Sequence, residues 1–130
     1  MIDHVSVEVA GLKEAAEFYE AILATIGYEK LIEEAGTVGF GKKYPDFWLN
    51  YRPNKQKAAD DSGFHVCLRA SSMDAVNAFY QTAIASGART SGKPGFRPEY
   101  HESYYAAFIK DKDNNHIEVV TFVSTGNNET

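Results

Sequence analysis

The sequence predicts an α+β fold in which one domain is built from two βαβββ halves. Three observations support this prediction. A length of 130 residues fits one compact domain. Two segments of the chain, 61 positions apart, repeat the same pattern. Within each segment the apolar spacing changes from alternation, which is typical of a strand, to a period of about 3.6, which is typical of a helix.

The repeat superposes residues of the same type without a gap. His4-Val5 falls on His65-Val66, and Phe18-Tyr19 falls on Phe79-Tyr80. In both segments the histidine opens a strand whose alternate residues are apolar, so each histidine lies on the more polar face of its strand. Aligned aromatic residues on a helix are explained by core packing, whereas matched histidines at two strand starts are not.

The first half, about 1–53, predicts one strand, one helix and three further strands. Its first strand follows His4, and its helix runs from Leu12 towards Gly27, a residue that favours helix ends. The remaining strands are expected at 28–34, 37–41 and 47–52. A polar segment, 54–62, is expected to link the halves.

The second half, about 63–123, repeats this order. Its helix is expected to start at Ser71, with Asp74 three residues later in the manner of a capping box. A weak strand is expected near 88–91, then a loop rich in Gly and Pro at 92–102. Clear strands at 104–110 and 116–123 flank a turn at 111–115. The domain should therefore cover 1–123, with a flexible tail at 124–130.

Composition excludes several classes of protein. The formal net charge is −5 and the sequence has no cluster of Lys and Arg, which argues against nucleic-acid binding. Neither a membrane-spanning apolar stretch nor a signal peptide is evident, so we expect a cytoplasmic protein with no membrane partner. The single cysteine, Cys67, excludes an internal disulfide and a Cys-rich zinc site. Any metal site must therefore use histidines and carboxylates.

Glu118 is the carboxylate best placed to join the two histidines. It lies in the last strand between Ile117 and Val119, where an unpartnered acid is costly to bury. Two histidines and one acid form a 2-His-1-carboxylate set, which leaves coordination positions open. Such a set suits Fe, Mn, Ni or Zn, and the residues do not choose among these divalent ions.

Three motifs resemble those of the vicinal oxygen chelate superfamily, which includes glyoxalase I, extradiol dioxygenases and bleomycin- and fosfomycin-resistance proteins. They are Ile2-Asp3-His4-Val5, then Phe64-His65-Val66, and the segment 111–118, which is similar to the family's closing pattern DPDGN-x-IE. The segment 100–108 resembles a glyoxalase-like subgroup. The resemblance implies a curved mixed sheet around a cup-shaped cavity for a metal and a substrate.

The resemblance also implies roles for individual residues. His4, His65 and Glu118 match the metal ligands of the family. The fourth ligand is a Glu in glyoxalase I, and its position here falls on Trp48, with Asn50 or Asp46 as alternatives if the register shifts by two. The departure weakens a strict glyoxalase I interpretation, because that Glu acts as the base.

The function expected from the resemblance is that of a metal-dependent lyase or isomerase. It would act on a small oxygen-bearing substrate through a stabilised oxyanion or enediolate. Glu118 and His101 are the candidate catalytic groups, and His101 is suited to proton transfer because histidine titrates near neutral pH. The candidate substrate-binding residues are Trp48, Arg69, Tyr104 and Tyr105. Of the two tyrosines only one can face the cavity, because they point to opposite faces.

Several alternatives remain open from sequence. Arg69 can instead form a structural ion pair with Glu8, its repeat partner. Glu118 can likewise form an ion pair with Arg69 or Arg97 in place of binding a metal. An extradiol-type Fe(II) dioxygenase fits a three-ligand site, and a metal-free binding protein of the bleomycin-resistance kind fits an aromatic-lined groove. A homodimer is expected by analogy with the family, and its halves can pair within one chain or by exchange between two.

Overall fold

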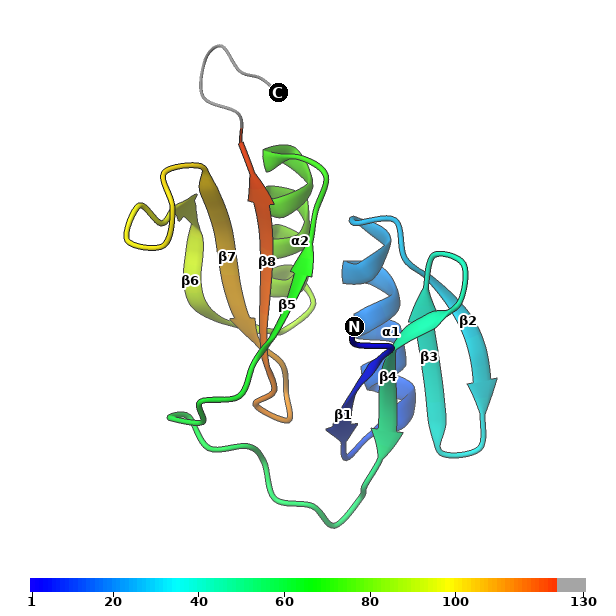
Figure 1. Ribbon diagram of the computed structural model, residues 1–130. Helices are drawn as coiled ribbons and strands as arrows, with labels where there is room; N and C mark the ends of the chain where they lie inside the picture. The colour runs from blue at the N-terminus through cyan, green and yellow to red at the C-terminus, as the bar shows by residue number, and fades with distance from the viewer. Residues whose placement is uncertain (124–130) are drawn as a thin grey trace.

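The computed structural model describes residues 1–123, which form two βαβββ halves (Figure 1). The first half contains β1 (Val5–Val9), α1 (Leu12–Ala24), β2 (Glu29–Glu34), β3 (Thr37–Gly41) and β4 (Pro45–Tyr51). The second contains β5 (Val66–Arg69), α2 (Met73–Ala85), β6 (Arg89–Phe96), β7 (Tyr104–Lys110) and β8 (His116–Phe122). The predicted fold class is confirmed, and the predicted tail at 124–130 lies outside the described residues.

The two halves have the same sheet topology. The strand order is β1-β4-β3-β2 in the first sheet and β5-β8-β7-β6 in the second. In each sheet the first and last strands of the half run parallel, and the other pairs are antiparallel. Strands β1 and β5 are edge strands that pair only within their own sheets in residues 1–123. The expected single curved sheet is therefore two separate sheets, which do not close into one cup.

Both helices lie behind the sheets in the view of Figure 1, and they leave the opposite faces of the sheets free of helix. Each helix packs on its own sheet, and α1 also contacts α2. The fully buried side chains are large and apolar and include Tyr19, Phe40, Phe47 and Phe79. Burial of this apolar area is the main favourable term in folding. No helix within residues 1–123 is both long and apolar enough to cross a membrane.

Two local predictions are wrong in detail. Strand β6 extends to Phe96, through much of the segment predicted as a loop, because β7 offers its backbone as a partner. Its register shifts at Gly92 and Gly95, where glycine tolerates an irregular ladder. The second helix is capped by Ser72 instead of Ser71, since Ser72 Oγ accepts a hydrogen bond of 3.1 Å from the Ala75 amide.

The turn between β7 and β8, residues 111–115, connects the two halves. Tyr19 Oη on α1 donates a 2.5 Å hydrogen bond to Asp111 Oδ2, and both residues are buried. Asp113 Oδ1 accepts a 3.0 Å bond from the Ala10 amide, and Asn115 Nδ2 donates a 2.9 Å bond to the Glu8 carbonyl. These bonds reach from the second half to β1 and α1, so the turn holds the halves in one arrangement.

Asn114 extends this connection to the linker. Its backbone has a φ of 64°, a conformation in which Asn is enriched. Its side chain donates to the Ala58 carbonyl and to Asp60 Oδ1, and it accepts a bond from Arg89. The same turn therefore anchors the segment that joins the halves.

Candidate functional site

The second half contains a buried carboxylate, and both of its oxygens form hydrogen bonds. Glu118 on β8 is only 3% exposed. His65 Nε2 lies 2.9 Å from Glu118 Oε1, and Tyr104 Oη donates a 2.5 Å hydrogen bond to Glu118 Oε2. His65 precedes β5 and its side chain is about half exposed. The histidine ring thus lies between the carboxylate and solvent.

Strand alternation explains why Glu118 faces away from the helix. Ile117 and Val119 are buried in the main hydrophobic core. Glu118 therefore points to the opposite face of the sheet, where Cys67 on β5 is its partner in the parallel register. A charge buried on this face is stabilised only if it is paired and hydrogen-bonded, which is the role of His65 and Tyr104.

The Cys67 thiol and the Tyr104 phenol beside Glu118 keep their protons at neutral pH. Burial, followed by the negative charge of Glu118, raises the pKa of Cys67 to about 12. Burial and the hydrogen bond to Glu118 raise the pKa of Tyr104 above its usual range. Cys67 is therefore not a thiolate nucleophile, and Tyr104 is a hydrogen-bond donor to the carboxylate.

The register of the first half puts Trp48 at the position equivalent to Glu118. Ser6 pairs with Trp48 on β1 and β4, and its repeat partner Cys67 pairs with Glu118 on β5 and β8. The Trp48 ring packs against Gly39, where the Cβ atom of any larger residue would lie only 2.9 Å from Trp48 Cζ3. An indole therefore occupies the place where the first half would carry its own acid.

The structure brings together two of the three expected ligands. His65 and Glu118 are in contact, whereas His4 belongs to the first half, where its Nδ1 lies 2.8 Å from Asp3 Oδ1. Within the described part of the chain, no group of three or more His, Cys, Asp or Glu side chains is placed to hold a metal ion. The three-ligand set thus stays a prediction. Within residues 1–123, His4 is not placed with His65 and Glu118 to hold a metal ion.

Two buried polar atoms lack a hydrogen-bond partner among residues 1–123, namely Asp46 Oδ1 and His116 Nε2. They occupy equivalent positions in the repeat. Asp46 precedes Phe47, which pairs with Val5 of β1. In the same way His116 precedes Ile117, which pairs with Val66 of β5. Each orphaned atom therefore lies on the strand beside one of the matched histidines, where a buried polar group without a partner is costly.

The remaining predicted residues are distributed over two faces. Tyr104 shares the face of Glu118, whereas Tyr105 faces α2 and donates a 2.7 Å bond to Asn77 Oδ1. His101 lies in the loop before β7, where its Nδ1 accepts a bond from the Ser103 amide and its ring is 6.4 Å from that of Phe122. His101 is thus near the end of β8 and makes no contact with Glu118 that would indicate proton transfer between them.

The alternative ion pairs expected for the arginines do not form in the described chain. Glu8 pairs with Arg52 and Lys55, and not with Arg69. Glu118 pairs with His65, and neither Arg69 nor Arg97 contacts it in an ion pair. Both arginines instead lie over phenylalanine rings on the face of Glu118.

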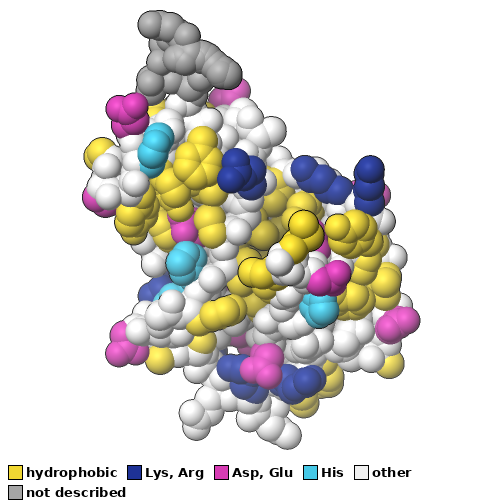
Figure 2. All heavy atoms as spheres, in the orientation of Figure 1, with side chains coloured by type: hydrophobic (Ala, Val, Ile, Leu, Met, Phe, Trp, Pro, Cys, Tyr) yellow, Lys and Arg dark blue, Asp and Glu magenta, His cyan; other side chains and the backbone are white. Residues whose placement is uncertain are grey.

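Sequence reasoning missed an aromatic wall on this face. The Tyr104 ring lies 5.1 Å from that of Tyr100 and 5.3 Å from that of Phe122, both edge to face. Phe122 and Tyr100 are exposed, at 45% and 61%. Figure 2 shows hydrophobic side chains gathered on this side of the molecule over β7 and β8. Alternation along β8 puts Phe122 on the side of Glu118, whereas the antiparallel register of β7 and β8 makes Tyr104 its partner.

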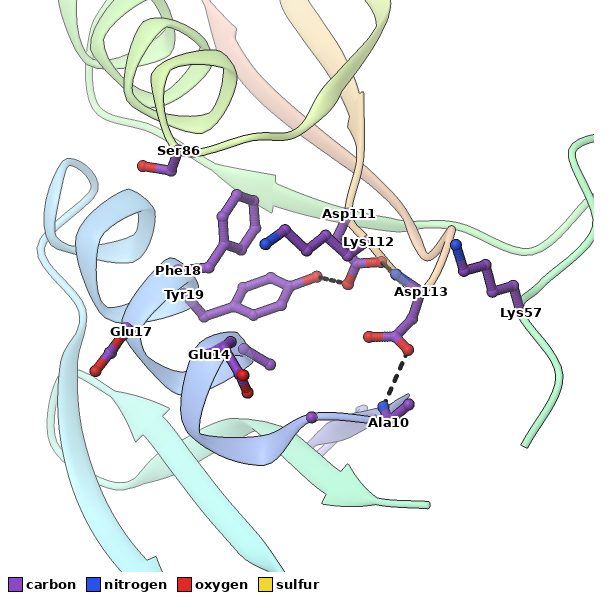
Figure 3. Close-up of a pocket in the computed structure, with 12 residues that line it drawn as sticks. Ala10, Glu14, Glu17, Phe18, Tyr19, Lys57, Ser86, Asp111, Lys112 and Asp113 are labelled. Carbon is purple, nitrogen blue, oxygen red and sulfur yellow. Dashed lines mark hydrogen bonds between the residues drawn. The ribbon is translucent and has the colours of Figure 1, made fainter. Parts of the chain in front are cut away.

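A larger cavity lies away from this face. It has a volume of about 660 Å³ and lies between α1 and the turn at 111–113 (Figure 3). Its wall includes the Tyr19–Asp111 bond that connects the halves, and none of the predicted site residues lines it. A hollow of about 130 Å³ lies beside His65, Phe108 and His116. We place the site on the face of Glu118, where His65 lines the smaller hollow and also contacts the Glu118 carboxylate.

Comparison with known proteins agrees with this topology. The model of the family described as Glyoxalase/Bleomycin resistance protein/Dioxygenase superfamily matches residues 1–119. Among curated proteins, no sequence matches this chain. A glyoxalase/bleomycin resistance protein from Albidiferax ferrireducens T118 is 28% identical, with a TM-score of 0.80 over 91% of this chain and 96% of that one.

Two more distant structures share the fold. A glyoxalase/bleomycin resistance protein/dioxygenase family enzyme from Burkholderia phytofirmans PsJN is 16% identical, with a TM-score of 0.73 over 94% of this chain and 98% of that one. A mutant of the fosfomycin resistance protein FosX from Listeria monocytogenes, complexed with Mn(II) and 1S,2S-dihydroxypropylphosphonic acid, is 13% identical. Its TM-score is 0.70, over 95% of this chain and 90% of that one.

Proposed function

Because the chain belongs to the Glyoxalase/Bleomycin resistance protein/Dioxygenase superfamily, we propose that it is a metal-dependent enzyme acting on a small molecule with two neighbouring oxygens. The reaction we propose is of the lyase or isomerase type. One observation carries the proposal: a carboxylate that is 3% exposed is bonded to the histidine that the repeat singles out. A core-packing role does not require an acid at that position.

The residues present fit a divalent cation. His65 and Glu118 supply one nitrogen and one carboxylate oxygen from the second half, and these are donors that Zn, Ni, Mn and Fe accept. Two unpartnered atoms, Asp46 Oδ1 and His116 Nε2, lie on the strands beside His4 and His65 and support a site that takes further groups. We propose that a second copy of the chain completes the site, so that His4 of the partner subunit is the third ligand.

A homodimer formed by exchange accounts for the separate sheets. The open faces of the two halves would each meet the other half of the partner, which covers the exposed Phe122 and Tyr100. Exchange also brings Trp48 of the partner subunit opposite Glu118. The indole would then form an apolar wall at the position where glyoxalase I has its fourth ligand.

The roles of this chain's residues follow from their contacts. When bound, the cation would act as a Lewis acid that stabilises negative charge on substrate oxygens. Tyr104 holds one oxygen of Glu118 and leaves the other directed at His65. Glu118 is the carboxylate among the proposed ligands, and it is also our candidate for accepting a proton from the substrate. His101, in the loop beside Phe122, is the second candidate for proton transfer.

A second candidate function is an extradiol-type Fe(II) dioxygenase. The observation in its favour is Trp48, which leaves one carboxylate and two histidines as the available ligands. This function predicts Fe(II) dependence and oxygen uptake with catechols, whereas the lyase or isomerase function predicts neither.

Metal content tests the proposal most directly. We expect the wild-type protein, loaded and then desalted, to retain close to one divalent ion per chain by elemental analysis. His65→Ala and Glu118→Gln should each reduce this content to near zero, because each removes a ligand. Glu33→Gln, on an exposed strand, and His101→Ala are the controls. A wild-type protein that retains no ion would contradict the proposal and favour a metal-free binding protein.

Tyr104→Phe is expected to weaken metal binding by about 10-fold to 100-fold, because partners that orient a ligand have effects of this size. The neighbouring Tyr105→Phe is a matched control, since it also removes one hydroxyl and one hydrogen bond, to Asn77 on the other face. Competition with a fluorescent chelator would measure both affinities. Equal affinities in the two variants would show that Tyr104 does not orient Glu118.

A further inference from the structure

The four arginines of the chain divide into two kinds. Arg52 and Arg89 lie near acids, with nitrogen to oxygen distances of 3.8 Å to Glu8 and 3.7 Å to Asp60. Arg69 and Arg97 form no ion pair with any acid in residues 1–123. An arginine without a carboxylate partner usually extends into solvent. The guanidinium groups of Arg69 and Arg97 instead each lie over an aromatic ring.

Each of these guanidinium groups lies over a phenylalanine. Arg69 Cζ is 4.9 Å from the centre of the Phe122 ring, and Arg97 Cζ is 5.4 Å from that of Phe108. Cation–π contact of this kind orients the planar group. Arg97 also donates a 2.7 Å bond to the Lys93 carbonyl. The side chains are therefore partly ordered before any ligand binds, which lowers the entropy cost of binding.

Both phenylalanines belong to the face of Glu118. Phe108 is the direct cross-strand partner of Glu118 in the register of β7 and β8. Phe122 lies further along β8, where its ring is 5.3 Å from the ring of Tyr104, the hydrogen-bond donor to Glu118. The paired small residues Ala106 and Val120 separate the two rings along the strands. One Phe–Arg stack therefore lies on each side of these small residues.

The charge on this face favours an anion. Both oxygens of Glu118 already have hydrogen-bond partners, His65 and Tyr104, while the two stacked arginines have no counter-ion within the described chain. Guanidinium groups bind carboxylate and phosphoryl oxygens in a planar, two-point geometry. A bound divalent cation would add further positive charge to the same face.

We propose that Arg69 and Arg97 bind the acidic groups of the substrate, which is a small organic anion of the carboxylate or phosphoryl class. The inference rests on the proposed function for the identity of the site, but anion binding by the arginines does not itself require the metal.

The test uses the metal-stripped protein, so that it is independent of the metal proposal. Glutarate is the carboxylate probe and methylphosphonate the phosphoryl probe, with glutaramide and dimethyl methylphosphonate as their neutral counterparts. Arginine side-chain Nε–Hε signals are followed by NMR during each titration. We expect the signals of Arg69 and Arg97 to shift with at least one anion, those of Arg52 and Arg89 to stay in place, and neither neutral compound to have an effect.

Variants make the assignment specific. Arg69→Gln and Arg97→Gln should each weaken anion binding by about 10-fold, as expected for loss of a charge-assisted hydrogen bond. Arg69→Lys and Arg97→Lys should recover part of the affinity, because they keep the charge without the planar group. Arg52→Gln is the matched control, and circular dichroism verifies that each variant is folded.

The outcomes separate the two proposals. Anion binding that persists in both glutamine variants, or that is lost in only one, would overturn the paired role of the arginines. A response to the neutral compounds equal to that of the anions would overturn the substrate class. A protein that binds the anions through both arginines but retains no metal would contradict the proposed function and leave this inference intact. Binding of glutarate would identify the substrate as a carboxylate, and binding of methylphosphonate would identify it as a phosphoryl compound.

Discussion

A mixture of His4→Ala and His65→Ala chains is expected to regain metal sites that neither variant has alone. In an exchanged dimer each site takes His4 from one chain and His65 with Glu118 from the other. After random exchange of equal amounts, half of the dimers contain one chain of each kind, and one of their two sites has all its ligands. Roughly one quarter of the sites should therefore be restored, starting from affinities lowered by more than about 100-fold.

The control for this experiment is a mixture of His65→Ala and Glu118→Gln chains. Both substitutions lie in the second half, so every site in the mixed dimer contains one of them. Elemental analysis after unfolding, mixing and refolding measures both mixtures. If the site is formed within one chain, neither mixture will regain metal, and the exchanged dimer is excluded. The wild-type content, measured in parallel, verifies that refolded protein binds the ion.

Asp111→Ala is expected to lower the free energy of unfolding by about 3–5 kcal/mol, which is a large share of the stability of a small domain. Asp111 accepts hydrogen bonds from Tyr19 Oη, from the amides of Asp113 and Asn115, and from Asn115 Nδ2. Because Tyr19 is fully buried, its hydroxyl would lose the Asp111 carboxylate as its partner inside the protein. Urea unfolding, followed by far-UV circular dichroism, measures the change.

Two further variants make this prediction specific. Asp113→Ala removes a bond to the Ala10 amide at an exposed position and should cost less than about 1 kcal/mol. Tyr19→Phe removes only the hydroxyl and should cost about 1–3 kcal/mol. Equal destabilisation by Asp111→Ala and Asp113→Ala would show that burial of the Tyr19–Asp111 pair does not govern the stability of the connection between the halves.

Much of the fold follows from sequence because its signals are local. Alternating apolar residues placed β1 and β5, and the helical period placed α1 and α2, since both patterns arise from backbone geometry. The second part of β6 was predicted as a loop, because Gly92, Pro94 and Gly95 are poor strand residues. Its pairing with β7 overrides that local preference through backbone hydrogen bonds.

Of the candidate site, the structure shows the expected proximity of His65 and Glu118, while the metal-ligand roles stay predictions. The offset of the repeat identified His4 and His65, and strand alternation put Glu118 on the polar face. The bond from Tyr104 to Glu118 depends on the register of β7 against β8, and this register is not encoded in the spacing of either strand. The stacking of Arg69 on Phe122 likewise needs the placement of β5 beside β8.

The sequence by itself determined two matched halves, a histidine at the start of each, and the side of each strand on which the polar residues lie. Only the tertiary structure decided that the sheets stay separate and that the turn at 111–115 holds the halves together. It also decided that Trp48, and not Asn50 or Asp46, takes the position equivalent to Glu118. The physical reason is that periodicity specifies which face of an element is buried. Which element covers that face depends on contacts between residues far apart in the chain, such as Tyr19 and Asp111.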